Sequence, residues 1–339
     1  MNVLYISHPA SLLHDPQALS PEHPDHPARL EAIEAALAGA QFEGLERLSA
    51  PAASETELTL VHTDGHVAFI RNLCEAGGGE IDADTYVGEA SYQAALHAAG
   101  GACALVRALS SGQATTGFCA LRPAGHHAER DRAMGFCVFN NVSIAAELAI
   151  RTLGVRRVLI IDWDVHHGNG TAEIFRHRRD VLVADIHQSG LFPGTGAIAD
   201  IGSGDGQGYT VNLPVPRGSG EDVWLSLIEH LIVPIGLEYR PELVLVSAGY
   251  DAHAADPLGE CRLHAESFGQ MTCHVRDLAR RLDAPLGAVL EGGYDPTALG
   301  QSVVATIAAL QGQGDARSAA PDGMVTPRAA SHLGHRWTL

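Results

Sequence analysis

Acidic side chains and a histidine follow two short apolar runs of this sequence. The run 158–161 leads into Asp164 and His166, and the run 243–247 leads into Asp251. Residues two apart in an extended chain point to the same side, so Asp164 and His166 can bind one ion together. With Asp251 they supply two carboxylates and one imidazole, which leaves a coordination position open, as in catalytic metal sites. Oxygen and nitrogen ligands of this kind suit Zn²⁺, Fe²⁺, Mn²⁺ or Co²⁺.

A tandem histidine pair, His126 and His127, offers a second kind of chemistry. Two loop histidines are ordinarily solvent-exposed, but imidazole titrates near neutral pH and therefore suits proton transfer. Asp162 and Asn169 stand close in sequence to the expected metal ligands and are candidates to orient the two rings. Tyr294 follows two glycines and could present its phenol to the same site, although a packed tyrosine in a turn is the ordinary alternative.

Each of these groups follows a segment with the pattern of a buried β-strand. Near-continuous apolar runs alternate with stretches of helical periodicity, which is typical of a parallel sheet covered on both faces. The carboxyl ends of such strands meet at one edge, where the active sites of α/β proteins form. We therefore predict a single-domain α/β fold with a mostly parallel central sheet. The expected strands cover the N-terminal run and residues 116–120, 157–162, 181–185, 209–213, 242–247 and 286–290, and the expected helices cover residues 141–153, 222–239, 265–282 and 296–310.

The chain shows no linker-like break before residue 310. We expect residues 1–310 to form the catalytic domain and residues 311–339, rich in Gly, Ala, Ser and Pro, to form a loosely packed or partly mobile extension. A glycine-rich stretch at 202–208 resembles a phosphate-binding loop, but it leads into a strand instead of a helix. We therefore interpret it as a turn.

The composition limits the partners and the location of the protein. The 339 residues carry 22 Lys+Arg against 40 Asp+Glu, a formal net charge of −18, whereas binding to nucleic-acid phosphates needs clustered basic residues. No apolar run is long enough to cross a membrane, and the N-terminus lacks the basic region of a signal peptide. The six cysteines form no CxxC pair, which is typical of free thiols in a reducing compartment. The sequence thus predicts a cytoplasmic protein with neither a nucleic-acid nor a membrane partner.

The loops that carry the candidate residues resemble the histone deacetylase and acetylpolyamine amidohydrolase superfamily, and its class II branch more than class I. The resemblance follows the family's order over nearly all of residues 1–310 and includes several loops of unrelated sequence. It implies an arginase/deacetylase-like fold and Zn²⁺-dependent hydrolysis of an acyl amide. The matching stretches are 23–30 (HPDHPARL), 122–127 (RPAGHH), 135–141 (GFCVFNN), 162–171 (DWDVHHGNGT), 192–196 (FPGTG), 247–251 (SAGYD), 256–259 (DPLG) and 291–294 (EGGY).

The resemblance also implies roles for individual residues. The zinc ligands of the family, which also suit Fe²⁺, are matched by Asp164, His166 and Asp251. His127 matches the general base and acid, with His126 as its electrostatic partner, and Tyr294 matches the phenol that stabilises the oxyanion.

Further matches surround these positions. Asp162 would support His126, and Asn169 would partner His127. Arg29 matches an arginine near an internal cavity through which acetate leaves. The walls and floor of the narrow substrate tunnel are matched by Gly135, Phe136, Phe192 and Leu258.

Some positions depart from parts of the family. Asn169 stands where class I members carry Asp, which fits class II and gives His127 a neutral partner. Asp185 stands where many members carry Ser near a structural monovalent cation, so the expectation of a K⁺ site is weaker here. Leu258 replaces an acid of polyamine-selective relatives, which favours an acyl-lysine substrate over an acetylpolyamine.

We therefore expect a Zn²⁺-dependent deacetylase acting on acyl-lysine peptides or proteins, with an acetylpolyamine or other small-amide deacetylase as the alternative. An arginase-type hydrolase would need a two-manganese site, and Asn169 stands where such a site requires another acid. A non-catalytic binder should have lost a metal ligand, the base or the phenol, and the sequence retains all of them. The sequence is compatible with a homo-oligomer.

Overall fold

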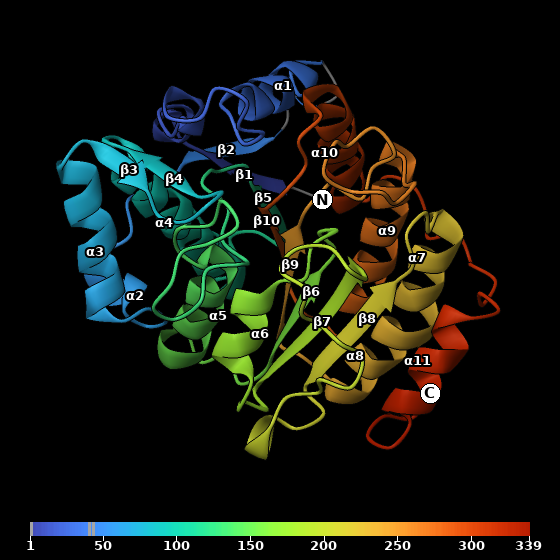
Figure 1. Ribbon diagram of the computed structural model, residues 1–339. Coiled ribbons are helices and arrows are strands. Elements are labelled where there is room, and N and C mark those ends of the chain that lie inside the picture. Colours follow the sequence, from blue (N-terminus) through green and yellow to red (C-terminus); the bar gives the residue numbers. More distant parts are fainter. Residues whose placement is uncertain (1–2, 40–41, 43–44) are drawn as a thin grey trace.

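An eight-stranded sheet crosses the middle of the protein, with helices on both of its faces (Figure 1). The computed structural model describes residues 3–39, 42 and 45–339. Every pairing between neighbouring strands of this sheet is parallel, which confirms the predicted fold class. In spatial order the strands are β2 (Glu46–Ser49), β1 (Val3–Ser7), β5 (Thr116–Cys119), β10 (Leu286–Leu290), β9 (Leu243–Ala248), β6 (Val158–Asp162), β7 (Val181–Gln188) and β8 (Thr210–Val215).

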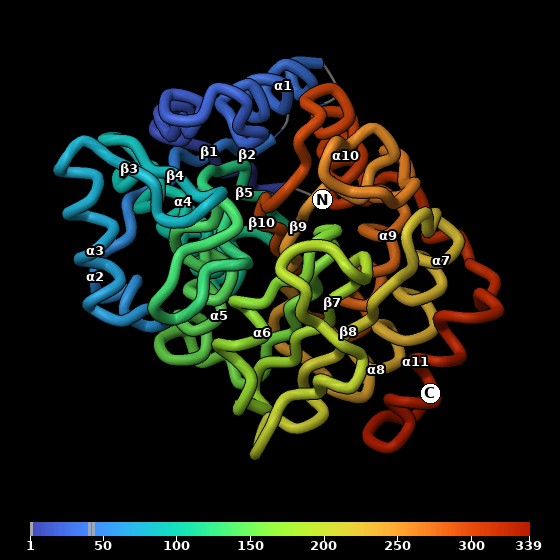
Figure 2. The backbone as a smooth tube through the Cα atoms, viewed as in Figure 1, coloured from blue at the N-terminus to red at the C-terminus, as the bar shows by residue number. Residues whose placement is uncertain are grey.

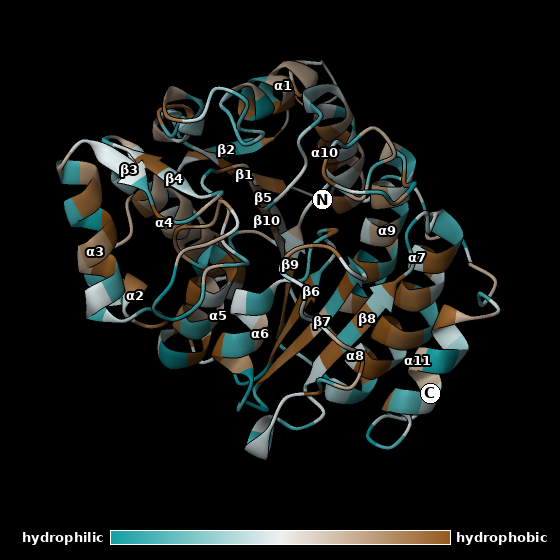
Figure 3. Ribbon diagram, in the orientation of Figure 1, coloured by the Kyte–Doolittle hydropathy of each residue, from teal (hydrophilic) through white to brown (hydrophobic). Residues whose placement is uncertain are grey.

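The strands separate two hydrophobic cores. In β6, Val158 and Ile160 pack into one core, while Leu159 and Ile161 pack into the other. Figure 3 shows the apolar character of the central strands and of the helix faces turned toward them. Both faces of a parallel sheet are covered, so its strands consist of continuous apolar runs instead of alternating ones.

Helices cover each face of the sheet. One core contains residues of α2 (Glu55–Leu58), α3 (Asp64–Glu75), α4 (Ser91–Ser110), α5 (Asn141–Thr152) and α6 (Asn169–Phe175). The other contains residues of α1 (Ala28–Ala36), α7 (Glu221–Leu227), η5 (Ile228–Ile232), α8 (Val233–Tyr239), α9 (Ala265–Arg281), α10 (Pro296–Leu310) and α11 (Val325–Leu333).

The helix predicted over residues 222–239 is present but not regular. Its middle part, η5, is a π-helix between α7 and α8. Pro234 lies at the start of α8 and has no N–H to donate to the carbonyl four residues earlier, so the regular hydrogen-bond pattern is interrupted there. Proline thus changes the winding of the helix without ending it.

Loops and short elements complete the fold. The hairpin of β3 (Gly78–Glu80) and β4 (Tyr86–Gly88) lies outside the main sheet, and the short helices are η1 (Pro9–Leu12), η2 (Pro16–Ala18) and η4 (Gly204–Gly206). Because β7 and β8 are parallel, residues 189–209 must return from the carboxyl end of β7 to the amino end of β8 (Figure 2). The glycine-rich stretch 202–208 belongs to this return and contains η4.

The end of the chain is partly packed. Residues 311–324 contain no helix or strand, whereas α11 and the residues after it bury Ala329, Leu333 and Trp337. The expected loose extension therefore contains a packed segment, while its boundary at residue 310 remains a prediction. All six cysteines are buried and unpaired, as expected. Within the described ranges, the chain has no helix with the length and apolar character needed to span a membrane.

Candidate active site

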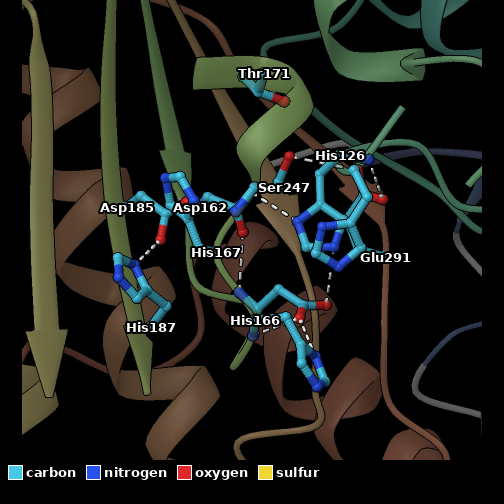
Figure 4. A network of polar contacts seen from close by, with 12 residues as sticks. His126, Asp162, His166, His167, Thr171, Asp185, His187, Ser247 and Glu291 are labelled. Atoms are coloured by element: carbon cyan, nitrogen blue, oxygen red, sulfur yellow. Dashed lines mark hydrogen bonds and ion pairs between the residues drawn. The ribbon is translucent and has the colours of Figure 1, made fainter. Parts of the chain in front are cut away.

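The three expected metal ligands meet at the carboxyl edge of the sheet. β6 precedes Asp164 and His166, and its neighbour β9 precedes Asp251. His166 Nδ1 lies 3.1 Å from Asp164 Oδ1 and 3.1 Å from Asp251 Oδ2. Both aspartates are fully buried, and His166 lies at the lower end of the polar network drawn in Figure 4. The adjacency of β6 and β9 thus brings together two chain segments that are 85 residues apart.

Glycines give the two carboxylates room. A Cβ atom at Gly249 would lie 2.1 Å from Asp164 Oδ2, and one at Gly292 would lie 2.2 Å from Asp251 Oδ2. Gly292 N–H also donates to Asp164 Oδ2 at 2.8 Å, and Val165 N–H donates to Asp251 Oδ1 at 2.7 Å. Any larger side chain at these glycines would push the carboxylates out of position.

The electrostatics of this cluster suit a cation. Burial and the nearby charge of Asp164 raise the pKa of Asp251 to about 7. Burial alone would lower the pKa of His166, but hydrogen bonds to Asp164 and Asp251 raise it to about 10. Two buried carboxylates therefore require positive charge between them. Their oxygens and His166 Nδ1 lie within 4.8 Å of one another, so a single ion could contact all three.

The tandem histidines lie beside this cluster with their ring centroids 4.0 Å apart. His126 Nδ1 lies 3.0 Å from Asp162 Oδ2, and His127 Nδ1 lies 2.8 Å from Asn169 Oδ1. Burial lowers the pKa of His126, but Asp164 and Asp162 outweigh it and hold that pKa well above its usual value. Burial, with the charges of His126 and His166, holds the pKa of His127 well below its usual value. The surroundings thus favour the charged form of His126 and the neutral form of His127.

Glu291, a fully buried residue after β10, anchors the histidine loop, and the sequence reasoning assigned it no role. Its Oε2 accepts the backbone N–H of Gly125 at 2.7 Å and of His126 at 3.1 Å, and Ser247 Oγ donates to its Oε1 at 3.3 Å. Figure 4 shows Glu291 beside His126. The acidic residue before the two glycines could have indicated such an anchor, because an isolated carboxylate after a buried strand needs partners.

Aromatic rings surround the histidine and the phenol. Phe136 lies edge-on to Tyr294 with the ring centroids 5.6 Å apart, and Phe192 lies edge-on to His127 at 5.0 Å. Gly135 has φ +57°, and a Cβ there would lie 2.5 Å from the His127 ring. Gly135 and Phe192 therefore lie against the ring of the candidate base, and Phe136 lies against Tyr294.

Leu258 is linked to Tyr294 through one carboxylate. Asp256 accepts the backbone N–H of Tyr294 at 2.6 Å through Oδ2 and that of Leu258 at 2.9 Å through Oδ1. Leu258 is half-buried in this loop. The loop after β9 and the loop after β10 are thereby held together.

Arg29 lies behind the phenol as part of a buried charge cluster. Its guanidinium carbon is 4.7 Å from the centre of the Tyr294 ring, and it donates to the carbonyls of Glu291 and Gly293 at 2.6 Å each. Asp25 Oδ1 accepts hydrogen bonds from Arg29 at 2.7 Å and from Arg122 at 2.6 Å. The expected exit cavity beside Arg29 remains a prediction, whereas Asp25 and Arg122 are partners that the sequence reasoning did not identify.

Asp162 and Asp185 lie on paired positions of β6 and β7. Asp185 Oδ1 lies 2.6 Å from His187 Nδ1, and Gly168 N–H donates to Asp185 Oδ2 at 2.9 Å. Burial is the main cause that raises the pKa of Asp162 well above its usual value, and Asp185 adds to the shift. The K⁺ site expected near Asp162 remains a prediction.

Comparisons with known proteins identify the family of this chain. A family model described as "Histone deacetylase domain" matches residues 23–310. The chain is 41% identical over 270 residues to "Histone deacetylase-like amidohydrolase" of Pseudomonas aeruginosa, covering 79% of this chain and 71% of that protein. It is 40% identical over 301 residues to "Polyamine deacetylase HDAC10" of Homo sapiens, covering 84% of this chain and 44% of that protein.

A solved structure shares the whole architecture. The "Crystal Structure of HDA15 HD domain" matches with a TM-score of 0.89 and 34% sequence identity, covering 98% of this chain and 95% of that one. The matched residues 23–310 include every candidate site residue described above. The chain therefore belongs to the histone deacetylase family, whose members include deacetylases and amidohydrolases.

Proposed function

We propose that this protein is a Zn²⁺-dependent deacetylase that hydrolyses the acetyl amide of lysine-like amines. The observation that carries the proposal is the convergence of a three-ligand cluster, a neutral buried imidazole and a phenol at one edge of the sheet. The three ligands would be Asp164, His166 and Asp251, whose donor atoms and buried negative charge suit Zn²⁺. A Zn²⁺ ion bound there supplies a Lewis acid that activates water and polarises the amide carbonyl.

His127 is the proposed general base and acid. Its low pKa keeps the ring neutral, so it can accept a proton from the attacking water and then return it to the leaving amine. The charged ring of His126, held by Asp162, adds positive charge near the developing oxyanion. Burial is the main cause that raises the pKa of Tyr294 well above its usual value. The phenol therefore stays protonated and can donate a hydrogen bond to that oxyanion.

The substrate class follows from the apolar residues around the site. Phe136 and Phe192 suit packing against the methylene chain of a lysine-like amine, and Leu258 supplies no charge to bind a distal ammonium group. These features favour acyl-lysine in a peptide or protein. The likeness to a polyamine deacetylase supports acetylpolyamine as the second candidate.

The test compares kcat/KM of the Zn²⁺-loaded protein on an acetyl-lysine peptide and on N-acetylputrescine. We expect turnover of both amides to depend on Asp251 and a higher kcat/KM for the peptide. The chain contains no lysine, so any acetyl-lysine detected by mass spectrometry belongs to the substrate. A higher kcat/KM for the polyamine would select the second candidate, and no turnover of either amide would reject deacetylation. A metal content near two ions per chain would instead indicate an arginase-type centre.

A further inference from the structure

A chain of hydrogen bonds runs from His127 through Asn169 to Glu129. Asn169 Oδ1 lies 2.8 Å from His127 Nδ1, and Asn169 Nδ2 donates to Glu129 Oε1 at 2.9 Å. His127 and Asn169 are both buried, whereas Glu129 is half-buried. An imidazole, an amide and a carboxylate are thus connected in series by hydrogen bonds, and the carboxylate is the most exposed of the three groups.

The surroundings of Asn169 fix the direction of its amide. Three acceptors face the Nδ2 end: Glu129 Oε1 at 2.9 Å, the His127 carbonyl at 3.4 Å and Met134 Sδ at 3.5 Å. Only an N–H donor fits among acceptors, so Oδ1 must point to His127. Of the three, the carboxylate makes the shortest contact and is the only one that carries a charge, so it contributes most to this orientation.

The amide direction decides the tautomer of His127. An amide oxygen accepts but cannot donate, so His127 Nδ1 must carry the hydrogen, and Nε2 keeps its lone pair. A flipped amide would present N–H to Nδ1 and move the ring hydrogen to Nε2. The proposed base needs a free lone pair at Nε2, and a flipped amide would therefore leave it unable to accept the proton.

We propose that Glu129 is a positioning residue that holds the Asn169 amide and thereby keeps His127 in the Nδ1–H tautomer. This inference rests on the proposed function of His127 as the general base. The backbone of Glu129 is itself fixed, because its N–H donates to the Arg132 carbonyl at 2.9 Å and its carbonyl lies 3.0 Å from His62 Nδ1. The side chain therefore starts from a defined place at the rim of the site.

Two variants separate this role from a general loss of structure. Glu129→Leu removes the acceptor, whereas Glu129→Gln keeps an oxygen that can accept from Asn169 Nδ2. We expect Glu129→Leu to lower kcat by about 10- to 100-fold with KM nearly unchanged, the range typical for partners of active-site groups, and Glu129→Gln to restore most of kcat. Glu173→Gln, in α6, is the matched control, because it removes a carboxylate close enough to Glu129 for the two charges to interact and leaves the Asn169–Glu129 hydrogen bond in place.

A spectroscopic readout tests the tautomer directly. Long-range ¹⁵N–¹H spectra of ¹⁵N-histidine-labelled protein distinguish a protonated Nδ1 from a protonated Nε2, and the His127 signals are assigned by their absence in His127→Gln. We expect the Nδ1–H pattern in the unmodified protein and in Glu129→Gln, and a loss or mixture of tautomers in Glu129→Leu. Zn²⁺ content and hydroxamate affinity should stay the same in all three proteins.

Several outcomes would overturn the proposal. These are an unchanged kcat in Glu129→Leu, an equal loss in Glu129→Gln and Glu129→Leu, or an unchanged Nδ1–H pattern in Glu129→Leu. Absence of turnover in the unmodified protein would contradict the proposed function instead, and the tautomer spectra would still decide the role of Glu129.

Discussion

Neighbouring side chains shift the pKa values of His126 and His127 in opposite directions. His126 faces two carboxylates, of Asp162 and Asp164, and these outweigh the cost of burying a charged ring. His127 faces the neutral amide of Asn169 and the positive His126, so burial keeps it neutral. Two adjacent imidazoles in one loop can therefore perform different tasks, one electrostatic and one in proton transfer.

Tyr294→Phe tests the proposed oxyanion donor. The substitution removes one hydroxyl and leaves the ring between Phe136 and Arg29. Loss of one oxyanion donor typically costs about 3 kcal/mol, so we expect kcat on an acetyl-lysine peptide to fall about 100-fold or more. Zn²⁺ content and the melting temperature should not change. Full turnover by Tyr294→Phe would show that the phenol has no part in the reaction.

Asp251→Asn tests the metal centre. The variant removes one of the two carboxylates proposed to bind Zn²⁺, so we expect Zn²⁺ to be lost on dialysis against a chelator concentration that the unmodified protein withstands. Metal content by mass spectrometry and kcat/KM measure the effect. Asp205→Asn, in the return loop before β8, is the matched control and should keep the Zn²⁺ content and the kcat/KM of the unmodified protein. Equal Zn²⁺ retention by Asp251→Asn would contradict the ligand set.

Among the elements, buried ion pairs connect loops that come from different parts of the chain. Asp25, just before α1, binds Arg29 of α1 and Arg122 after β5, while Arg29 reaches the carbonyls after β10. Burial alone would raise the pKa of Asp25, but Arg122 and Arg29 hold it well below its usual value. The turn that carries Tyr294 is therefore held by charges on two other elements.

Asp25→Asn tests this connection. Removing one partner of a buried charge cluster costs about 3–5 kcal/mol, and we expect a loss of this size in the free energy of unfolding at pH 7. The folded pKa of Asp25 is depressed, so its contribution is complete above the unfolded value of 3.8, decreases as the pH falls below 3.8, and is lost once the pH falls through the folded pKa. Urea unfolding at several pH values should show the two proteins converging in acid.

An exposed ion pair provides the control for this measurement. Glu55→Gln removes a carboxylate that pairs with Arg71 and is 61% exposed, and we expect a cost of about 1 kcal/mol or less. Equal stability of Asp25→Asn and the unmodified protein at pH 7, or a difference that persists unchanged in acid, would contradict the role of Asp25.

The sequence predicted those elements whose residues carry a local pattern. Continuous apolar runs identified β6, β9 and β10, and their carboxyl ends identified the candidate site. The edge strand β2 was not predicted, because Glu46–Ser49 is short and mostly exposed and therefore lacks an apolar run. The buried partners Asp25 and Arg122 were not predicted either, because charged residues are buried only where distant segments supply a partner.

Across the whole molecule, the candidate site and the buried Trp337 lie at opposite edges of the sheet. Trp337 Nε1 donates to the Gly208 carbonyl at 3.1 Å, just before β8 begins, and its ring contacts Tyr209 and Tyr239. Tyr239 Oη in turn donates to the Arg179 carbonyl before β7. The residues around Trp337 therefore pack at the amino edge of the sheet, whereas the proposed chemistry lies at the carboxyl edge.

Trp337→Ala tests whether stability and activity can be separated in this way. Trp337 is 3% exposed, and truncating a buried tryptophan costs about 3–5 kcal/mol, so we expect the free energy of unfolding to fall by about 3 kcal/mol. Because distant sites contribute independently, kcat and KM below the new melting temperature should change by less than about twofold. Trp337→Phe keeps an aromatic ring in contact with Tyr209 and should recover part of the lost stability. A fall in kcat that parallels the loss of stability would show that the two edges of the sheet are coupled, and unchanged stability would show that Trp337 contributes nothing to the stability of the fold.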